Sequence, residues 1–216
     1  MAENITLTLW AEKDGEVVMG EVFSGSVEEL ALDKIATYAA ASNTKAVTAL
    51  VDMLNYGAAV QVAFNHNATL LPNTKLDDFA GTETVPTFDA ENTLSGEGAV
   101  AITKNSISMQ AKVEIQLLFA TDISAYSVSA KVAGADAPVV IDTEKYAAYG
   151  WTLVKVAVAA DKMRQTYTIS LVDAEGNPVT QVLNASVEAY GKAQLGGTYN
   201  DVVVAMMRYG DSVAAL

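Results

Sequence analysis

The sequence predicts an α+β fold: a central antiparallel β-sandwich of immunoglobulin-like type, flanked by two duplicated units that are each a β-hairpin followed by a helical hairpin. Three observations predict it. A strand-turn-strand-helix pattern near the start of the chain returns at its end, residues 107–119 alternate between apolar and polar side chains, and apolar residues between 44 and 64 recur at helical spacing. An internal repeat constrains two segments to one local structure, so it indicates architecture more firmly than residue propensities do.

The repeat consists of four blocks in the same order. They are TLTL at 6–9, a turn glycine at 15, SVE at 26–28 and MLNYGAAV at 53–60, which return as TISL at 168–171, a glycine at 176, SVE at 186–188 and MMRYGDSV at 206–213.

The first copy predicts a unit over residues 1–65. Alternation from Ile5, a turn at residues 13–15 and a return over residues 17–23 indicate a β-hairpin. Ser26 is placed to cap a helix that runs to about Ala40, with carboxylates in its first turn, and residues 44–64 have the spacing of a second amphipathic helix.

Residues 66–98 predict an extended connector, because they are rich in Asn, Thr, Asp, Pro and Gly and their apolar residues follow neither helical nor strand spacing. Apolar residues spaced along it favour an ordered surface strap over a flexible linker.

Residues 99–216 predict the sandwich and the second helical hairpin, with the second copy of the repeat at 166–216. We interpret residues 107–119 as one long strand with one buried face. Further strands are expected at 126–132, 139–141, 151–158, 167–172 and 179–183, with a short helical turn at 159–163.

The two copies differ in what precedes them. Strands lead into the second hairpin, whereas the first hairpin begins at the first residues of the sequence. Two strands are too few for independent stability, so the first hairpin must pair with the central sheet, pack through its helices, or add to the sheet of a neighbouring subunit. For that last option the assembly candidates are Ile5, Leu7, Leu9 and Phe23.

Composition excludes several classes of partner. The net charge of −13 and the pI near 4.3 oppose binding to nucleic acid or to an anionic membrane surface. The chain has no cysteine, which excludes disulfides and thiolate metal sites. Met1–Trp10 lacks the features of a signal peptide, and we expect no membrane-spanning segment.

No residue pattern predicts catalysis, a cofactor or a metal site. Tyr56-Gly57 and Tyr209-Gly210 are interpreted as helix-packing motifs in which glycine allows another backbone to approach, with ligand binding as the alternative. His66 is the only histidine and is expected at a solvated helix end. Calcium binding by Asp77, Asp78 and Glu83 is an alternative that lacks the spacing of a calcium loop.

Residues 50–67, LVDMLNYGAAVQVAFNHN, resemble a module of large surface proteins of gut Firmicutes, in which an LLNYGAAAQ…FNYN helix follows a strand, a glycine turn, a strand and an SV..Y helix start. Residues 186–190 and 205–213 are similar to the same pattern, with Asp211-Ser212 in place of the usual small pair. The resemblance implies a Clostridia-like source and a non-catalytic module. Together with the missing export signal, it implies a structural component of a phage virion.

The leading hypothesis is therefore a non-enzymatic structural protein of a phage that infects Firmicutes: a capsid decoration, head-fibre or tail-associated subunit that binds protein and forms a homo-oligomer or larger assembly. The alternative is a cell-surface module that binds carbohydrate or a host. Aromatic rings stack on sugars, and the candidates are Trp10, Tyr146, Tyr149 and Trp151. An enzyme is the third and weakest hypothesis.

Overall fold

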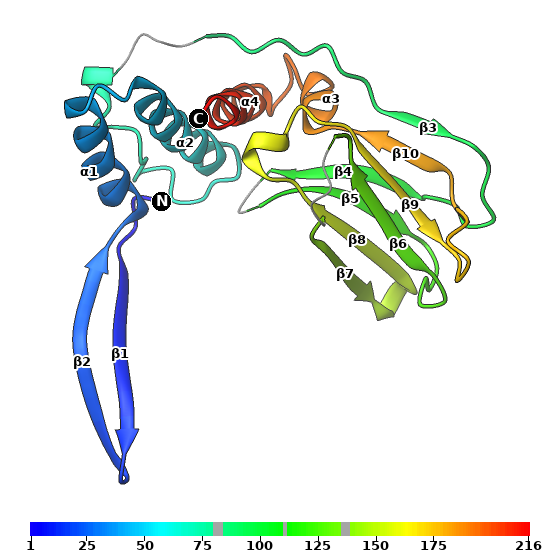
Figure 1. Cartoon of the computed structure of the whole chain (residues 1–216), viewed down its shortest axis with the longest axis horizontal. Coiled ribbons are helices and arrows are strands. Elements are labelled where there is room, and N and C mark those ends of the chain that lie inside the picture. Colours follow the sequence, from blue (N-terminus) through cyan, green and yellow to red (C-terminus); the bar gives the residue numbers. More distant parts are fainter. Residues whose placement is uncertain (80–83, 110–111, 135–138) are drawn as a thin grey trace. The chain divides into compact units, whose positions relative to one another are not determined.

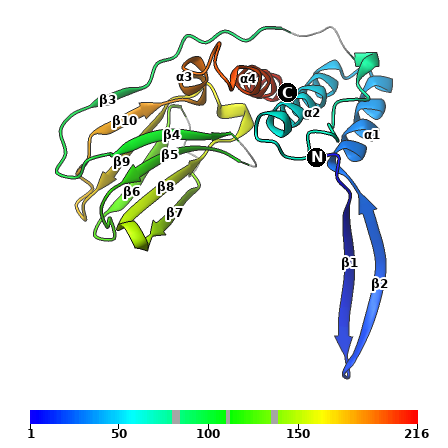
Figure 2. The same cartoon turned by 180° about the vertical axis from the view of Figure 1, so that it is seen from behind.

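The chain forms two compact units, Met1–Thr84 and Val85–Ala215, in the computed structural model (Figures 1 and 2). The structure describes residues 1–79, 84–109, 112–134 and 139–216, without the side chains of Leu9, Lys13 and Glu21. A mixed fold of helices and antiparallel sheets is confirmed. The segment expected as a separate connector, 66–98, is divided between the two units.

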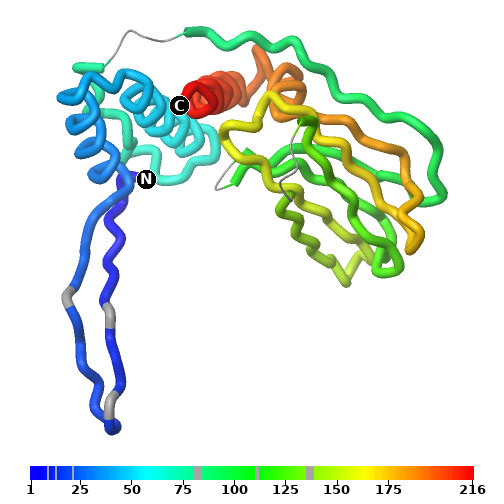
Figure 3. The backbone as a smooth tube through the Cα atoms, viewed as in Figure 1, coloured from blue at the N-terminus to red at the C-terminus, as the bar shows by residue number. Residues whose placement is uncertain are grey.

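The first unit begins with an antiparallel hairpin of β1 (Ile5–Lys13) and β2 (Glu16–Gly25), as predicted. Asp14 and Gly15 both have positive φ angles, 55° and 81°, which is the backbone of the two-residue turn that Asp-Gly favours. The register shifts between Thr8 and Trp10, which marks a β-bulge. The hairpin extends away from the helices of its own unit (Figures 1 and 3) and pairs with no other described strand.

Two helices complete the first unit, α1 (Val27–Ala40) and α2 (Thr44–Ala63). Ser26 caps α1: its Oγ accepts a hydrogen bond from the Glu29 N–H at 3.0 Å, and the Glu29 carboxylate accepts one from the Ser26 N–H. This reciprocal capping box satisfies two helix-end donors. The helices pack through a core of Ala31, Ile35, Val51, Leu54 and Leu76.

The segment after α2 is anchored to the first unit. The Gln61 side-chain amide donates to the carbonyls of Asn67 and Leu70 at 3.2 and 2.9 Å, and Leu76 is buried between the helices. A short 3₁₀ helix, η1 (Asp77–Phe79), follows.

The expectation that no segment has membrane-spanning length is wrong for α2. This helix has 20 residues, and an 18-residue stretch of it has a mean hydropathy of 1.2, enough to cross a membrane by length and composition; 44% of that stretch is buried inside the structure. Core helices have the same composition, because both surroundings exclude water.

The second unit contains two four-stranded antiparallel sheets. The first has the order β3 (Thr93–Ser95), β10 (Val182–Ala185), β9 (Tyr167–Val172), β6 (Ser127–Val132). The second has the order β4 (Lys104–Met109), β5 (Val113–Phe119), β8 (Trp151–Ala157), β7 (Ile141–Tyr146).

The prediction of one strand over residues 107–119 is wrong. The chain reverses between Met109 and Val113, which pair with each other, and Ile107 pairs with Ile115. Paired residues share a face of the sheet, so apolar residues recur at every second position on both sides of the reversal, at Ile107, Met109, Val113 and Ile115. The alternation therefore runs through the turn without interruption. The strand expected at 139–141 likewise lies further on, at Ile141–Tyr146.

Alternation does place the core of these sheets correctly. Every second residue of β5 and β8 is buried, including Ile115, Leu117, Val154 and Val156. The remaining elements are the 3₁₀ turns η2 (Ala147–Tyr149) and η3 (Ala160–Lys162) and the helices α3 (Val187–Lys192) and α4 (Asn200–Ala214).

The second unit holds two tyrosines that ionise late. Burial raises the pKa of Tyr167 and of Tyr190 to about 12. Their pKa in an unfolded chain is about 10, so between these values the unfolded chain releases protons that the folded chain retains. We expect full stability below pH of about 10 and a loss as the pH rises toward about 12, followed by circular dichroism. The prediction is contradicted if tyrosinate absorbance shows that Tyr167 and Tyr190 of the folded protein ionise with midpoints near pH of about 10.

Candidate functional site

The apolar side chains of hairpin β1–β2 are uncovered. Ile5, Leu7 and Phe23 are 58%, 62% and 58% exposed. Five more large apolar residues of the hairpin are exposed to a similar degree: Trp10, Val17, Val18, Met19 and Val22. The side chain of Leu9, the fourth assembly candidate, lies outside the described part of the chain. The sequence hypothesis thus named only part of a larger apolar surface.

This apolar surface occupies both faces of the hairpin. Leu7 is opposite Phe23 on one face, whereas Trp10 is opposite Met19 on the other. A strand pair with one solvated face normally carries polar residues there. The hairpin instead presents apolar side chains to solvent on both faces, and exposed apolar surfaces of this kind mark interaction sites in other proteins.

The two edges of the hairpin are also open, because β1 and β2 pair only with each other among the described strands. Proteins usually protect such edges with proline, lysine or a covering segment. Here the charged residues Glu12, Lys13, Asp14 and Glu16 gather at the tip, and the half of the hairpin nearest α1 is uncharged at Ile5–Thr8 and Val22–Gly25. The open edges near α1 can accept another strand.

The same local contacts surround the hairpin β9–β10 of the second unit. Ser186 caps α3 by accepting from the Ala189 N–H at 3.1 Å, as Ser26 caps α1. The Glu188 N–H donates to the Met163 carbonyl at 3.2 Å, and the Glu28 N–H donates to the Met1 carbonyl at 3.3 Å. The registers agree as well: Ile169 is opposite Leu183 as Leu7 is opposite Phe23.

The surroundings of the two hairpins differ. Strands β6 and β3 flank β9–β10, and Tyr167, Ile169 and Leu183 are only 1–2% exposed. The corresponding apolar face of β1–β2 is bare. The first hairpin thus carries a core face without the sheet that would cover it.

A buried glutamate holds the strap of the second unit, residues 85–95, in place. Oε1 of Glu188 accepts hydrogen bonds from the backbone N–H groups of Asp89 and Ala90 at 2.6 and 3.0 Å, and Oε2 is 3.2 Å from the Arg164 guanidinium. Arg164 also donates to Asp211 of α4 at 2.7 Å, and this carboxylate raises the pKa of the guanidinium. Sequence reasoning missed this role, although the repeated Ser-Val-Glu block contained the residue.

The Tyr-Gly pairs lie within helices α2 and α4. Tyr56 is buried, and burial raises the pKa of the half-buried Tyr209. A Cβ at Gly57 would lie 2.6 Å from Sδ of Met1, and one at Gly210 would lie 2.9 Å from Sδ of Met163 and 3.1 Å from the Ala160 carbonyl oxygen. Gly210 thus lies close to a backbone carbonyl and a methionine side chain, whereas Gly57 lies close to a methionine side chain.

Three of the four sugar-stacking candidates gather at one end of β7–β8. Tyr146 is the cross-strand partner of Trp151, and the rings of Tyr149 and Trp151 have centroids 5.3 Å apart. Tyr149 is 70% exposed. Trp10, the fourth candidate, is on hairpin β1–β2 of the first unit.

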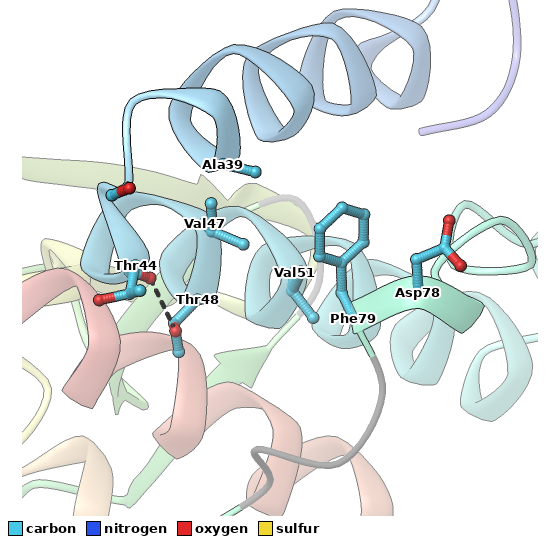
Figure 4. Close-up of a pocket in the computed structure, with 8 residues that line it drawn as sticks. Ala39, Thr44, Val47, Thr48, Val51, Asp78 and Phe79 are labelled. Atoms are coloured by element: carbon cyan, nitrogen blue, oxygen red, sulfur yellow. Dashed lines mark hydrogen bonds between the residues drawn. The ribbon is translucent and has the colours of Figure 1, made fainter.

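Two grooves lie in the first unit. One of about 400 Å³ lies between the end of α1, the start of α2 and η1, and Val47, Val51 and Phe79 line it with Asp78 at its rim (Figure 4). A second of about 380 Å³ lies beside His66, which is exposed and stacks on Phe64.

The described residues include no group of three His, Cys, Asp or Glu side chains able to hold a metal ion. The calcium alternative rests partly on Glu83, which lies outside the described residues.

No protein-family model, curated protein or solved structure matches this chain.

The two helix glycines give a matched test of packing. Alanine is favoured over glycine in a helix by roughly 1 kcal/mol. At Gly57 the methionine side chain can move, so Gly57→Ala should leave the free energy of unfolding unchanged or raise it by up to about 1 kcal/mol. At Gly210 the Ala160 carbonyl cannot yield as easily, so Gly210→Ala should lower it by about 1–3 kcal/mol. Urea denaturation measures both, and equal effects would contradict the packing geometry.

Proposed function

We propose that this chain is a non-enzymatic structural protein that assembles with other protein subunits through hairpin β1–β2. The observation that carries the proposal is a hairpin with apolar side chains on both faces and two open edges. Such a surface is costly to leave in water and is a template for strand pairing. Burying each large side chain contributes about 1.5–3 kcal/mol, so a few of them can sustain a specific interface.

We further propose a virion component as the biological setting: a capsid decoration, head-fibre or tail-associated subunit of a phage that infects Firmicutes. The support is the resemblance of residues 50–67 and 186–213 to a module of Firmicutes surface proteins, together with the assembly hairpin. The partner is protein, as a homo-oligomer or a larger assembly such as a capsid.

The proposal includes an evolutionary relation between the two units. We infer that the second unit is an immunoglobulin-like sandwich, since its sheet orders β4-β5-β8-β7 and β6-β9-β10 follow the A-B-E-D and C-F-G strand orders of that fold. Hairpin β1–β2 then corresponds to the F–G hairpin of that fold. The shared cap serines, methionine carbonyl contacts and registers support duplication.

Charged substitutions on the hairpin test the assembly proposal. Leu7→Asp combined with Phe23→Asp places two carboxylates on the apolar face, and desolvating them would oppose association. We expect the wild-type chain to self-associate and the double variant to be monomeric in size-exclusion chromatography with light scattering. Because both side chains are already exposed, the thermal unfolding of the variant should match that of the wild-type monomer.

A matched control carries the same charge elsewhere. Val62 and Val140 are also exposed, at 58% and 71%, and lie outside the hairpin. Val62→Asp combined with Val140→Asp should leave association intact. A wild-type chain that remains monomeric at every concentration, or association that survives the hairpin variant, contradicts the proposal.

A second candidate function is a cell-surface module that binds carbohydrate, and the exposed cluster of Tyr146, Tyr149 and Trp151 favours it. Neighbouring exposed rings at the end of a hairpin can stack against the apolar faces of sugars. The location would then be the bacterial surface.

The aromatic cluster can be tested separately from the hairpin. If it binds sugar, glycan-array binding should fall at least tenfold in Tyr149→Ala and Trp151→Ala, because each loses a stacking ring. Trp10→Ala is the control, since this ring belongs to the other unit. An array on which the wild-type chain binds nothing removes this second function.

A further inference from the structure

In the first unit the outer edge of β2 and the residue Glu28 form a track that corresponds to the one the strap covers in the second unit, whereas Ala31, the counterpart of Gly191, is buried in a core that includes Leu76. We propose that an extended segment of another polypeptide chain pairs with the outer edge of β2 at Val22–Ser24 and donates two successive backbone N–H groups to the buried Oε1 of Glu28. This inference rests on the proposed function, because it states which kind of partner the hairpin takes.

The second unit fills the equivalent track with its own strap. Strand β3 pairs antiparallel with β10, Thr93 opposite Asn184 and Ser95 opposite Val182. Just before β3, the N–H groups of Asp89 and Ala90 donate to Oε1 of Glu188. The Phe88 ring packs against Gly191 of α3, 3.0 Å from where a Cβ would lie. One extended segment thus completes the sheet edge and satisfies the glutamate.

The first unit has the same positions without the strap. Counted from the cap serines Ser26 and Ser186, Val22–Ser24 correspond to Val182–Asn184, and Glu28 corresponds to Glu188. Side-chain pairs across the hairpins also correspond: Thr6 Oγ1 donates to Ser24, and Thr168 Oγ1 donates to Asn184. In the first unit no described strand pairs with the outer edge of β2.

Glu28 marks this track independently of the sheet edge. The residue is 4% exposed, yet its Oε1 accepts no hydrogen bond from the described residues. The nearest cation is Lys75, whose Nζ is 3.6 Å away and whose side chain is 62% exposed and able to move aside. A buried carboxylate oxygen without a hydrogen bond is costly, and two backbone donors would satisfy it as they satisfy Glu188.

The surroundings of the track also limit the chemistry of the segment. It needs two successive residues other than proline, followed by a short strand-forming stretch. In the second unit Lys192 contacts the Asp89 carbonyl and Glu91 of the strap. Leu32 has the corresponding position in the first unit, so this position offers no cation to an acidic segment. With the acidic hairpin tip and the net charge of −13, this favours an uncharged or basic segment.

A peptide derived from the strap provides the probe. It covers residues 84–96 with Asp89→Asn and Glu91→Gln to remove its acidic charge, and it is added to the full-length chain. We expect calorimetry to find one site and hydrogen exchange to slow at the amides of Val22–Ser24. Glu28→Ala should weaken binding at least tenfold, and so should a peptide with proline at positions 89 and 90, which lacks both donors.

The matched variant Glu188→Ala separates the two tracks. It leaves Asp89 and Ala90 without their acceptor, so it should lower the Tm of the second unit and leave peptide affinity unchanged. Glu28→Ala should leave the Tm of the peptide-free chain unchanged or raise it, since a buried unsatisfied carboxylate is removed. Binding that is lost in Glu188→Ala but retained in Glu28→Ala overturns the inference, as does a peptide that does not bind.

The two proposals fail in different ways. Self-association that depends on Leu7 and Phe23, with no peptide binding, overturns only the proposed track. A peptide that binds with the expected dependence on Glu28, to a chain that never assembles, overturns only assembly through the apolar face.

Discussion

The carboxylate of Glu188 connects four segments of the second unit. It lies in the first turn of α3, accepts two N–H groups of the strap, and pairs with Arg164, which precedes β9 and also binds Asp211 of α4. A buried charge is tolerated only where partners satisfy it, so the strap, β9, α3 and α4 are held in one arrangement. Glu188 binds the strap at Asp89 and Ala90, and the end of the strap, strand β3, pairs with β10. The hairpin β9–β10 thereby becomes the interior of a four-stranded sheet.

The first unit shows the same local design without those connections. Ser26, Glu28 and the hairpin register repeat the arrangement around Ser186, but among the described residues the cation that pairs with Glu28 is the exposed Lys75. The helices α1 and α2 still form a core, because Ile35, Leu54 and Leu76 pack without help from the hairpin. The helices α1 and α2 therefore have their own core, although the apolar side chains of hairpin β1–β2 are uncovered. An element that costs free energy in the isolated subunit becomes favourable once a partner covers it.

Local signals predicted the first hairpin turn and the helix cap correctly, whereas contacts between distant segments could not be predicted from the sequence. Asp14-Gly15 predicts its turn and Ser26 its helix cap because each depends on residues within one turn of the chain. The alternation over 107–119 concealed a reversal, since Met109 and Val113 point to the same side. The pairing of Glu188 with residues about 100 positions earlier leaves no periodic signal. Three of the assembly candidates, Ile5, Leu7 and Phe23, are exposed, and Val17, Val18, Met19 and Val22 extend the apolar surface beyond the residues chosen.

The distribution of charge explains how such a hairpin can remain in solution before it meets a partner. Edge strands with apolar faces associate indiscriminately unless charge opposes them. At the tip, the carboxylates of Glu12, Asp14 and Glu16 outnumber the single ammonium of Lys13, so with the net charge of −13 they slow the approach of a second identical chain through the tip. Repulsion is weakest near α1, where the paired residues Thr6, Leu7, Phe23 and Ser24 are uncharged. In the proposed assembly, a partner strand therefore pairs with the part of β2 that leads to Glu28.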